Sequence, residues 1–202
     1  MKIALMNRLK AGLFVLLIIV SSSSRAQEDN AFVFTLHGGL FFPSIDGFDR
    51  VYQSHSDLIW SFGAAVPIGS GVLIGGDIGF FRSSGFFDAT LDSTARFEER
   101  IVHLGLQKKE SIGRRTFLRL NVGFNRVKVK QATASPRSSE RSVETDDNTG
   151  YFTGVGLEEL LESQHLSFYA DALYDYSRSH KREFSGDFGG FRFVIGLNII
   201  LF

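Results

Sequence analysis

Hydrophobic and polar residues alternate with a period of two along much of this chain, most clearly in residues 188–202. One face of this segment carries large apolar residues at every second position from Phe191 to Leu201, whereas the other face carries Arg192 and Asn198. A period of two is that of a β-strand, whose successive side chains point to opposite faces. We therefore expect a strand with one face in an apolar environment and the other in a polar or crowded interior.

Seven other segments have the same character and roughly the length of a membrane strand, about nine to eleven residues. After the first 26 residues, no segment is continuously apolar for the length of a membrane-spanning helix. The sequence therefore predicts an all-β fold, an eight-stranded antiparallel up-and-down transmembrane β-barrel. The predicted strands cover residues 32–42, 58–66, 72–82, 96–106, 116–128, 149–157, 166–177 and 188–202.

The connections between these strands alternate in length. Outer-membrane barrels have long loops on one rim and short turns on the periplasmic rim, so this alternation predicts N and C termini that are both periplasmic. The connection 129–148 is polar and poor in aromatic residues, so we expect it to be mobile and exposed, with adhesion or partner recognition as its role. The long connections are 43–57, 83–95, 129–148 and 178–187, and the short ones are 67–71, 107–115 and 158–165.

Two segments fit this alternation poorly. Arg96, Glu98 and Arg100 share the parity of the apolar residues in their strand, so they must lie at or above the outer headgroups. Residues 156–165 (GLEELLESQH) are rich in good helix formers. A short helix and a periplasmic turn both remain open for that segment.

The amino terminus has the pattern of a secretory leader. A basic start is followed by an apolar run at 11–20, which is too short to span a bilayer as a helix, and then by small residues at 21–26. We expect a cleaved signal peptide at 1–26, with cleavage between Ala26 and Gln27 and a barrel domain at 27–202. The expected location is the outer membrane.

Composition narrows the function classes. The chain has 22 basic and 22 acidic residues, and without the leader 18 basic residues remain, so it lacks the basic excess of nucleic-acid-binding proteins. Cysteine is absent, which removes disulfides and thiol chemistry from an exported chain.

Polar residues on the inward parity predict a structural network inside the barrel. The interior of an eight-stranded barrel is just wide enough for side chains to fill, and buried charges persist when they are paired. A filled lumen is therefore expected, and a narrow conduit favouring cations or a small-ligand pocket is the alternative. The network is predicted from Asp77, Arg119, Asn121, Asp171, Asp175 and Arg192, and the same parity includes His37, His103, Asn125, Glu158 and Asn198.

Aromatic residues gather where long connections meet strands. Aromatic side chains favour the membrane interface, so we expect them to form the outer girdle of the barrel. These residues are Phe41, Phe42, Trp60, Phe80, Phe81, Tyr151, Phe152, Tyr174, Tyr176 and Phe188.

Catalytic and metal-binding patterns are weak. His165 and Ser167 resemble the His-x-Ser pair of lipid A deacylases, but a third group must orient the base. Asp171 lies too far along the strand and Glu183 lies across a loop at the opposite rim. The five histidines lack the paired spacing of a metal site. We therefore expect no enzymatic activity, no cofactor and no metal.

The carboxyl-terminal Phe202, the alternating last strand and the glycine–aromatic pieces 75–81 and 167–171 resemble the small outer-membrane β-barrel superfamily. This superfamily includes the barrel domain of outer membrane protein A, OmpX-like proteins and opacity-type proteins. The resemblance covers residues 27–202, and it implies that Phe202 is the assembly signal read by the barrel assembly machinery. Phe202 is one residue out of phase with the apolar face, which ends on Leu201.

The sequence thus predicts a monomeric outer-membrane barrel with lipids and the assembly machinery as partners. A structural or interaction role at the cell surface would be carried by the long connections. The alternatives are a narrow porin-like channel or small-solute transporter, a lipid-modifying enzyme, and a soluble lipocalin-like barrel.

Overall fold

The computed structural model describes residues 32–45, 48–52, 55–88, 93–135, 138–144, 148–179 and 186–202. The predicted signal peptide and its cleavage site between Ala26 and Gln27 lie outside these residues. The elements are β1 (Phe32–Pro43), α2 (Phe48–Tyr52), β2 (Asp57–Gly69), β3 (Val72–Asp88), β4 (Ser93–Ser111), β5 (Thr116–Ser135), β6 (Ser138–Glu144), β7 (Asn148–Leu160), β8 (Leu166–Ser179) and β9 (Gly186–Leu201).

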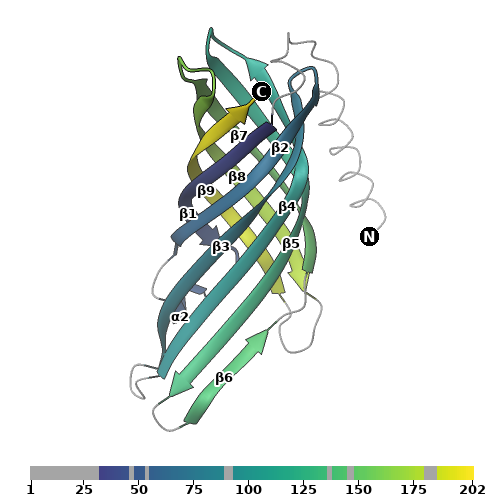
Figure 1. The fold of residues 1–202 in the computed structure, drawn as a ribbon. Helices are drawn as coiled ribbons and strands as arrows, with labels where there is room; N and C mark the ends of the chain where they lie inside the picture. Colours follow the sequence, from purple (N-terminus) through teal and green to yellow (C-terminus); the bar gives the residue numbers. More distant parts are fainter. Residues whose placement is uncertain are drawn as a thin grey trace, which may run out of the picture.

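Eight of these strands close into an antiparallel barrel, which confirms the predicted architecture (Figure 1). The order around the ring is β1-β2-β3-β4-β5-β7-β8-β9, and the pairing of β9 with β1 completes it. β6 pairs with β5 outside the ring. Phe32 lies opposite Leu201, so the first described residue and the carboxyl terminus share one rim.

The alternation in sequence becomes an alternation in exposure. In β9, Phe193 and Ile195 are 55% and 73% exposed, whereas Val194 between them is buried. In β5, Leu118 faces outward and the neighbouring Arg119 is buried inside. Because the side-chain period is two, a slip of one residue would exchange the two faces, so this pattern fixes the register.

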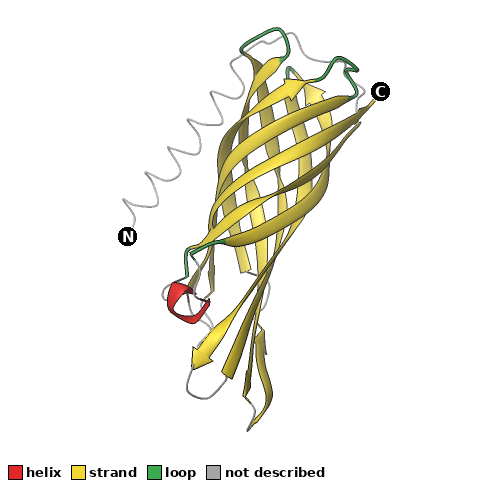
Figure 2. Cartoon of the chain, turned by 90° about the vertical axis from the view of Figure 1, so that its left-hand side faces the viewer, coloured by secondary structure: helices red, strands yellow, loops and turns green. Residues whose placement is uncertain are grey.

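Strands β3, β4 and β5, with β6 beside β5, extend well beyond the rest of the barrel at the rim away from the carboxyl terminus (Figures 1 and 2). The connections expected at 83–95 and 129–148 are therefore mostly strand: β3 reaches Asp88, β4 begins at Ser93, and β5 and β6 occupy much of 129–148. The alternation continues there, since Phe97 and Val129 point inward and are buried. The expectation of an irregular loop at 129–148 is wrong for the residues in β5 and β6, because their charged residues mark the outer face of strands.

Within the connection 43–57, the described residues 48–52 pack into the mouth of the barrel. Its helix α2 buries Phe48 and Tyr52, whose rings stack with centroids 4.5 Å apart and both contact the ring of Phe97. No helix among the described residues is long and apolar enough to cross a membrane. The last connection, predicted at 178–187, is shorter than expected: β8 ends at Ser179 and β9 begins at Gly186.

The segment 156–165 contains no helix. β7 continues to Leu160, and residues 161–165 form the turn to β8, in which Gln164 has a φ of 58°. Glu158 stays in the strand because its side chain points inward to buried basic partners. The favourable helix propensity of this segment is thus overridden by ion pairing inside the barrel.

Four of the ten residues predicted for the aromatic girdle do not lie on the outer surface. Trp60 and Phe80 lie on the outer surface, where their rings stack with centroids 4.6 Å apart. Four members of the predicted girdle are instead buried inside the barrel, because adjacent residues of a strand point to opposite faces. These four are Phe41, Phe81, Phe152 and Phe188.

The interior has three layers along the barrel axis. An apolar layer fills the end near α2, a polar layer fills the middle, and a small apolar cluster of Val33, Leu73 and Ile200 closes the end near the carboxyl terminus. The apolar layer near α2 contains Phe41, Phe48, Tyr52, Ile59, Phe81, Ala95, Phe97, Ile101, Val127, Val129, Phe152, Leu173, Phe188 and Val194.

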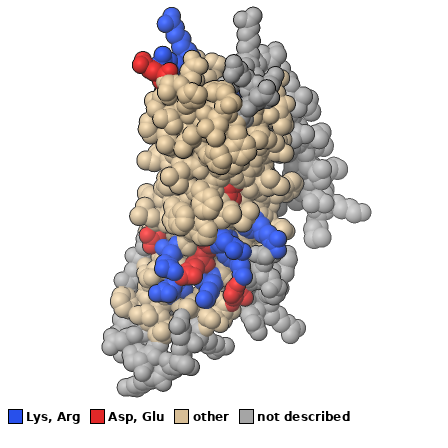
Figure 3. Space-filling model, viewed as in Figure 1, with Lys and Arg blue, Asp and Glu red and all other residues tan. Residues whose placement is uncertain are grey.

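The outer surface changes character between the barrel and its extension. Figure 3 shows one face with little charge over the barrel and, below it, a cluster of charged side chains in which Lys and Arg predominate over Asp and Glu. Arg96, Glu98 and Arg100 belong to this region and point outward. They share the parity of the apolar Val102 and Leu104, but they lie farther toward the extension, beyond the apolar part of the outer face.

Candidate functional site in the barrel interior

The polar layer is built from inward residues at the middle of the strands. At its end near the carboxyl terminus, the carboxylate of Glu158 accepts a hydrogen bond from Lys109 Nζ at 2.7 Å. Arg119 Nη1 donates to the other oxygen of Glu158, Oε2, at 3.3 Å, and the Ser167 hydroxyl donates to Oε1, the oxygen that Lys109 contacts, at 2.6 Å. Asn198 donates in turn to Ser167 Oγ at 3.0 Å. Glu158 is 2% exposed, so it is a buried anion with three donors.

Arg119 links this group to the centre of the barrel. Its Nη2 lies 3.1 Å from Asp171 Oδ2, and its guanidinium carbon lies 3.7 Å from the centre of the Tyr169 ring. Asn121 Nδ2 lies 3.5 Å from the same Asp171 oxygen. A guanidinium above an aromatic face is stabilised by the ring quadrupole, so Arg119 has an ionic and an aromatic partner.

Tyr169 continues the contacts toward β1. Its hydroxyl lies 2.7 Å from Thr35 Oγ1 and 2.7 Å from His37 Nδ1. Gly196 on β9 makes room for this ring, since a Cβ at that position would lie 2.4 Å from Tyr169 Cζ. The glycine is therefore part of how the sequence places Tyr169 in the lumen.

A second group surrounds Asp175 at the boundary with the apolar layer near α2. Arg192 Nε lies 2.7 Å from Asp175 Oδ2, and both side chains are buried. Asp175 Oδ1 accepts from Asn125 Nδ2 at 3.0 Å and lies 2.6 Å from His103 Nε2. The other ring nitrogen of His103 lies 3.0 Å from Asp77 Oδ1. Arg192 Nη2 also lies 3.1 Å from His103 Nε2, so this imidazole contacts two carboxylates and one guanidinium.

These contacts cross the lumen. His103 belongs to β4, whereas Asp175 and Arg192 belong to β8 and β9 on the other side of the ring. The ring of Phe152, from β7, packs edge-on against His103 with centroids 4.6 Å apart. These side chains therefore connect strands on opposite sides of the barrel through contacts across the lumen.

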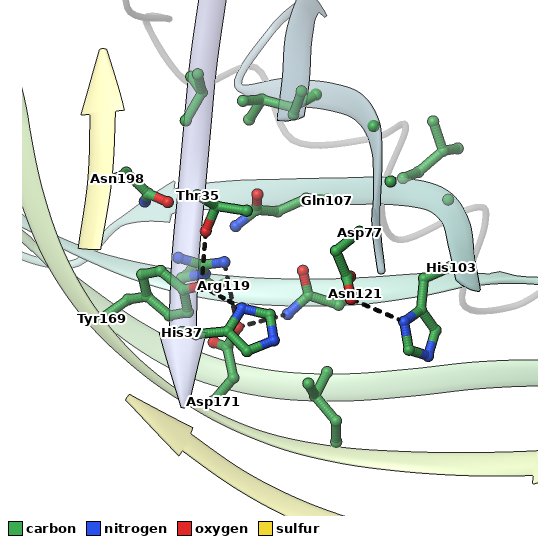
Figure 4. Close-up of a pocket in the computed structure, with 18 of the residues that line it drawn as sticks. Thr35, His37, Asp77, His103, Gln107, Arg119, Asn121, Tyr169, Asp171 and Asn198 are labelled. Atoms are coloured by element: carbon green, nitrogen blue, oxygen red, sulfur yellow. Dashed lines mark hydrogen bonds and ion pairs between the residues drawn. The ribbon is translucent and has the colours of Figure 1, made fainter. Parts of the chain in front are cut away.

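A small cavity lies within the polar layer (Figure 4). Its volume is about 90 Å³, room for a few water molecules. His37 Nε2 and Asp171 Oδ1 are buried without a hydrogen-bond partner among the described residues. Buried polar atoms beside a polar cavity are typical positions for internal water. Labelled residues around the cavity are Thr35, His37, Asp77, His103, Gln107, Arg119, Asn121, Tyr169, Asp171 and Asn198.

The structure brings the six predicted network residues to the interior in two groups. Arg119, Asn121 and Asp171 lie together in the first, and Asp175 and Arg192 lie together in the second. Asp77 reaches the second group through His103. Phe202 follows the end of β9 and is 53% exposed, with its ring 5.3 Å from that of His165.

Sequence reasoning misses several interior residues. It places Lys109 in a connection, although this residue shares the parity of His103 and is buried at 7% exposure. Tyr169 has the parity of Asp171, which could have identified it. Glu99 is 2% exposed in the apolar layer, and neither carboxylate oxygen has a hydrogen-bond partner among the described residues.

The histidine–serine pair does not form a catalytic dyad in this geometry. Ser167 Oγ points inward and donates to Glu158, while His165 lies in the turn with Nδ1 3.3 Å from the carbonyl oxygen of Ile200. Glu183 lies outside the described residues. Among the described residues there is no cluster of three or more His, Cys, Asp or Glu side chains that could hold a metal ion.

No family model and no curated protein matches the chain. Solved structures match its fold. Neisserial surface protein A has 9% identity and a TM-score of 0.59, covering 84% of this chain and 96% of that chain. A major outer membrane protein from Thermus thermophilus has 10% identity and a TM-score of 0.56, covering 84% of this chain and 99% of that chain.

A third match is Ail, the attachment invasion locus protein of Yersinia pestis, in complex with the heparin analogue sucrose octasulfate. It has 15% identity and a TM-score of 0.53, covering 86% of this chain and 100% of that chain. At these identities the likeness concerns the fold. The chain has the closed, eight-stranded fold of the small outer-membrane β-barrels, as its resemblance to them predicted.

Proposed function

We propose that this chain is an integral outer-membrane barrel with a filled, non-conducting lumen, and that its strand extension interacts at the cell surface. The observation that carries the proposal is the set of side chains crossing the lumen, Asp175, Arg192 and His103, beneath an apolar layer that includes α2. Paired and packed in this way, the described side chains enclose the small polar cavity described above.

The outer surface supports residence in a bilayer. The outward apolar run of β9 extends over ten residue steps from Phe191 to Leu201. This run corresponds to about 33 Å of strand and, at a tilt near 40°, to a height of about 25 Å. That height equals the apolar band of outer-membrane barrels, about 25 Å. Water around such a surface would be strongly unfavourable, because large apolar side chains cover it continuously.

The orientation follows from the two rims. Short turns and the carboxyl terminus lie on one rim, and the long extension lies on the other. In outer-membrane barrels the short turns face the periplasm. We therefore place both termini in the periplasm and the extension of β3–β6 outside the cell, where its exposed strands could meet a partner. The leader at 1–26, cleaved after Ala26, would direct this export.

Planar-bilayer recording tests the closed lumen against the runner-up function, a narrow channel. Purified barrel added to a bilayer is expected to give no stable conductance steps, with the detergent alone as negative control and a conducting porin as positive control. Heat-modifiable gel mobility establishes that the sample is folded. Reproducible unitary steps from folded protein would overturn the closed lumen and favour a channel through the polar layer.

A further inference from the structure

Basic side chains gather on the outer surface where the barrel meets its extension, with some acidic side chains among them (Figure 3). Six of the basic side chains form one group. They project outward from three adjacent strands, and strand pairing sets them in rows: Arg100 lies opposite Lys128, and Glu98 lies opposite both Arg82 and Lys130. We call these six residues the basic patch: Arg82, Arg96, Arg100, Arg126, Lys128 and Lys130.

The basic patch begins at the level of an aromatic cluster. Trp60 pairs with Phe80, and Phe80 pairs with Arg100, so the aromatic and basic side chains share one row around the barrel. In the next row toward the short turns, Ile78 pairs with Val102, and Val102 pairs in turn with Arg126 of the patch. Tryptophan is typical of the level where acyl chains meet headgroups, so the patch lies beside the headgroup level.

Acidic residues neutralise only part of the patch. Arg82 Nη2 lies 2.5 Å from Glu98 Oε1, and Lys128 forms an ion pair with Glu144 of β6. The hydrogen bond and charge of Lys128 lower the pKa of the Glu144 carboxyl from its ordinary value. Arg100 and Lys130 form no ion pair with the described residues, so cationic groups remain available to an anion.

The shape of this surface suits an amphipathic anion. An open groove runs along it, with Leu58, Trp60 and Phe80 on its apolar side and Arg100 and Lys128 on its cationic side. Its lining also includes carboxylates, those of Asp57, Glu98, Glu99 and Glu144. An acyl chain could lie along the apolar side while an anionic headgroup meets the cationic side. Arginine and lysine are well suited to phosphate, which accepts several charge-assisted hydrogen bonds.

We propose that the basic patch binds the phosphorylated headgroup of a lipid in the outer leaflet, with an acyl chain packed against Trp60 and Phe80. The proposal rests on the proposed function, because it requires the barrel to span the membrane with its extension outside. Two observations favour a lipid over a soluble anion: the charges share a row with the aromatic cluster, and the groove has an apolar side.

The chain contains a natural reporter for this site, because Trp60 is its only tryptophan. Purified barrel in phosphatidylcholine nanodiscs would be titrated with diphosphorylated lipid A while Trp60 fluorescence is recorded. A saturable change is expected, with binding at least tenfold weaker for the same lipid after both phosphates are removed.

A charge-matched pair of variants localises the binding. R100Q/K130Q removes two basic groups of the patch and is expected to weaken binding about thirtyfold, at about 1 kcal/mol per basic residue. R114Q/R115Q removes the same charge from the turn at the opposite rim, where both residues are exposed, and is expected to bind like the parent. Gel mobility shows whether each variant is folded, and single substitutions replace a pair that is not.

Three results would overturn the proposal. These are equal binding of the two lipid forms, equal weakening by both pairs of substitutions, and a response to soluble sucrose octasulfate with none to lipid A. The last would assign the patch to a soluble polyanion. Each result concerns only the patch, because conductance separately tests the closed lumen and the folded state in nanodiscs tests membrane residence.

Discussion

The buried carboxylate of Glu158 offers the sharpest test of how the polar layer stabilises the barrel. Replacing Glu158 with glutamine keeps the size of the side chain but removes the negative charge between Lys109 and Arg119. Asp171 would then be the remaining anion in contact with this group. Removing one partner of a buried ion pair costs about 3–5 kcal/mol, because the other charge stays buried without compensation.

A matched control lies on the same rim. Glu162 pairs with Arg115 at 3.4 Å, but their side chains are 90% and 50% exposed. Exposed pairs contribute about 0–1 kcal/mol, so Glu162→Gln is expected to change stability little. Both substitutions exchange glutamate for glutamine, and the comparison therefore isolates the effect of burial.

Urea unfolding from lipid vesicles measures the difference. Trp60 lies on the outer surface, so its fluorescence reports when the barrel leaves the bilayer. With a slope of about 2 kcal/mol per molar urea, Glu158→Gln should lower the midpoint by about 1.5–2.5 M. A midpoint shift no larger than that of Glu162→Gln would refute the view that Glu158 neutralises buried cations.

Two other substitutions test how the interior is packed. Gly196→Ala places a methyl group against the Tyr169 ring and should destabilise the barrel by about 1–3 kcal/mol in the same urea assay. A urea midpoint equal to that of the parent would show that the Tyr169 ring moves freely. Phe48→Ala removes a buried ring from α2 and should cost about 3–5 kcal/mol. The Phe48 variant should nevertheless stay silent in bilayer recordings, because the polar layer still fills the lumen, and new conductance steps would show that α2 alone closes it.

The strands could be predicted because the two faces of each strand lie in different environments, the outer surface and the interior of the barrel. Leu118 and Arg119 are neighbours in β5, and only opposite faces can satisfy both. The same reasoning places Asp77, Arg192 and Asp175 on the inward parity without knowledge of their partners. Parity gives the side of the sheet, but the partner of each residue depends on the register between strands.

The sequence predictions are wrong where residue type, aromatic or charged, is given more weight than the inward or outward position that strand alternation assigns. Phe41 and Phe81 are aromatic residues near a rim, yet they point inward. Adjacent residues of a strand point to opposite faces, and here Phe42 and Phe80 take the outward positions. Charge alone suggests a turn at Lys109, although strand β4 continues through it to Ser111. The position of α2 in the barrel mouth depends on tertiary packing of Phe48, for which a single sequence has no local signal.

The central claim is that acyl chains surround the apolar outer face of the barrel. A single tryptophan at Ile195, which is 73% exposed, would test it in a Trp60→Phe background with lipids brominated at mid-chain. Strong quenching is expected there, and little quenching is expected for a tryptophan at Ile112 in the turn between β4 and β5. If Ile195→Trp were not quenched, or if the processed barrel stayed folded and monodisperse in buffer without detergent, water and not lipid would bathe this face.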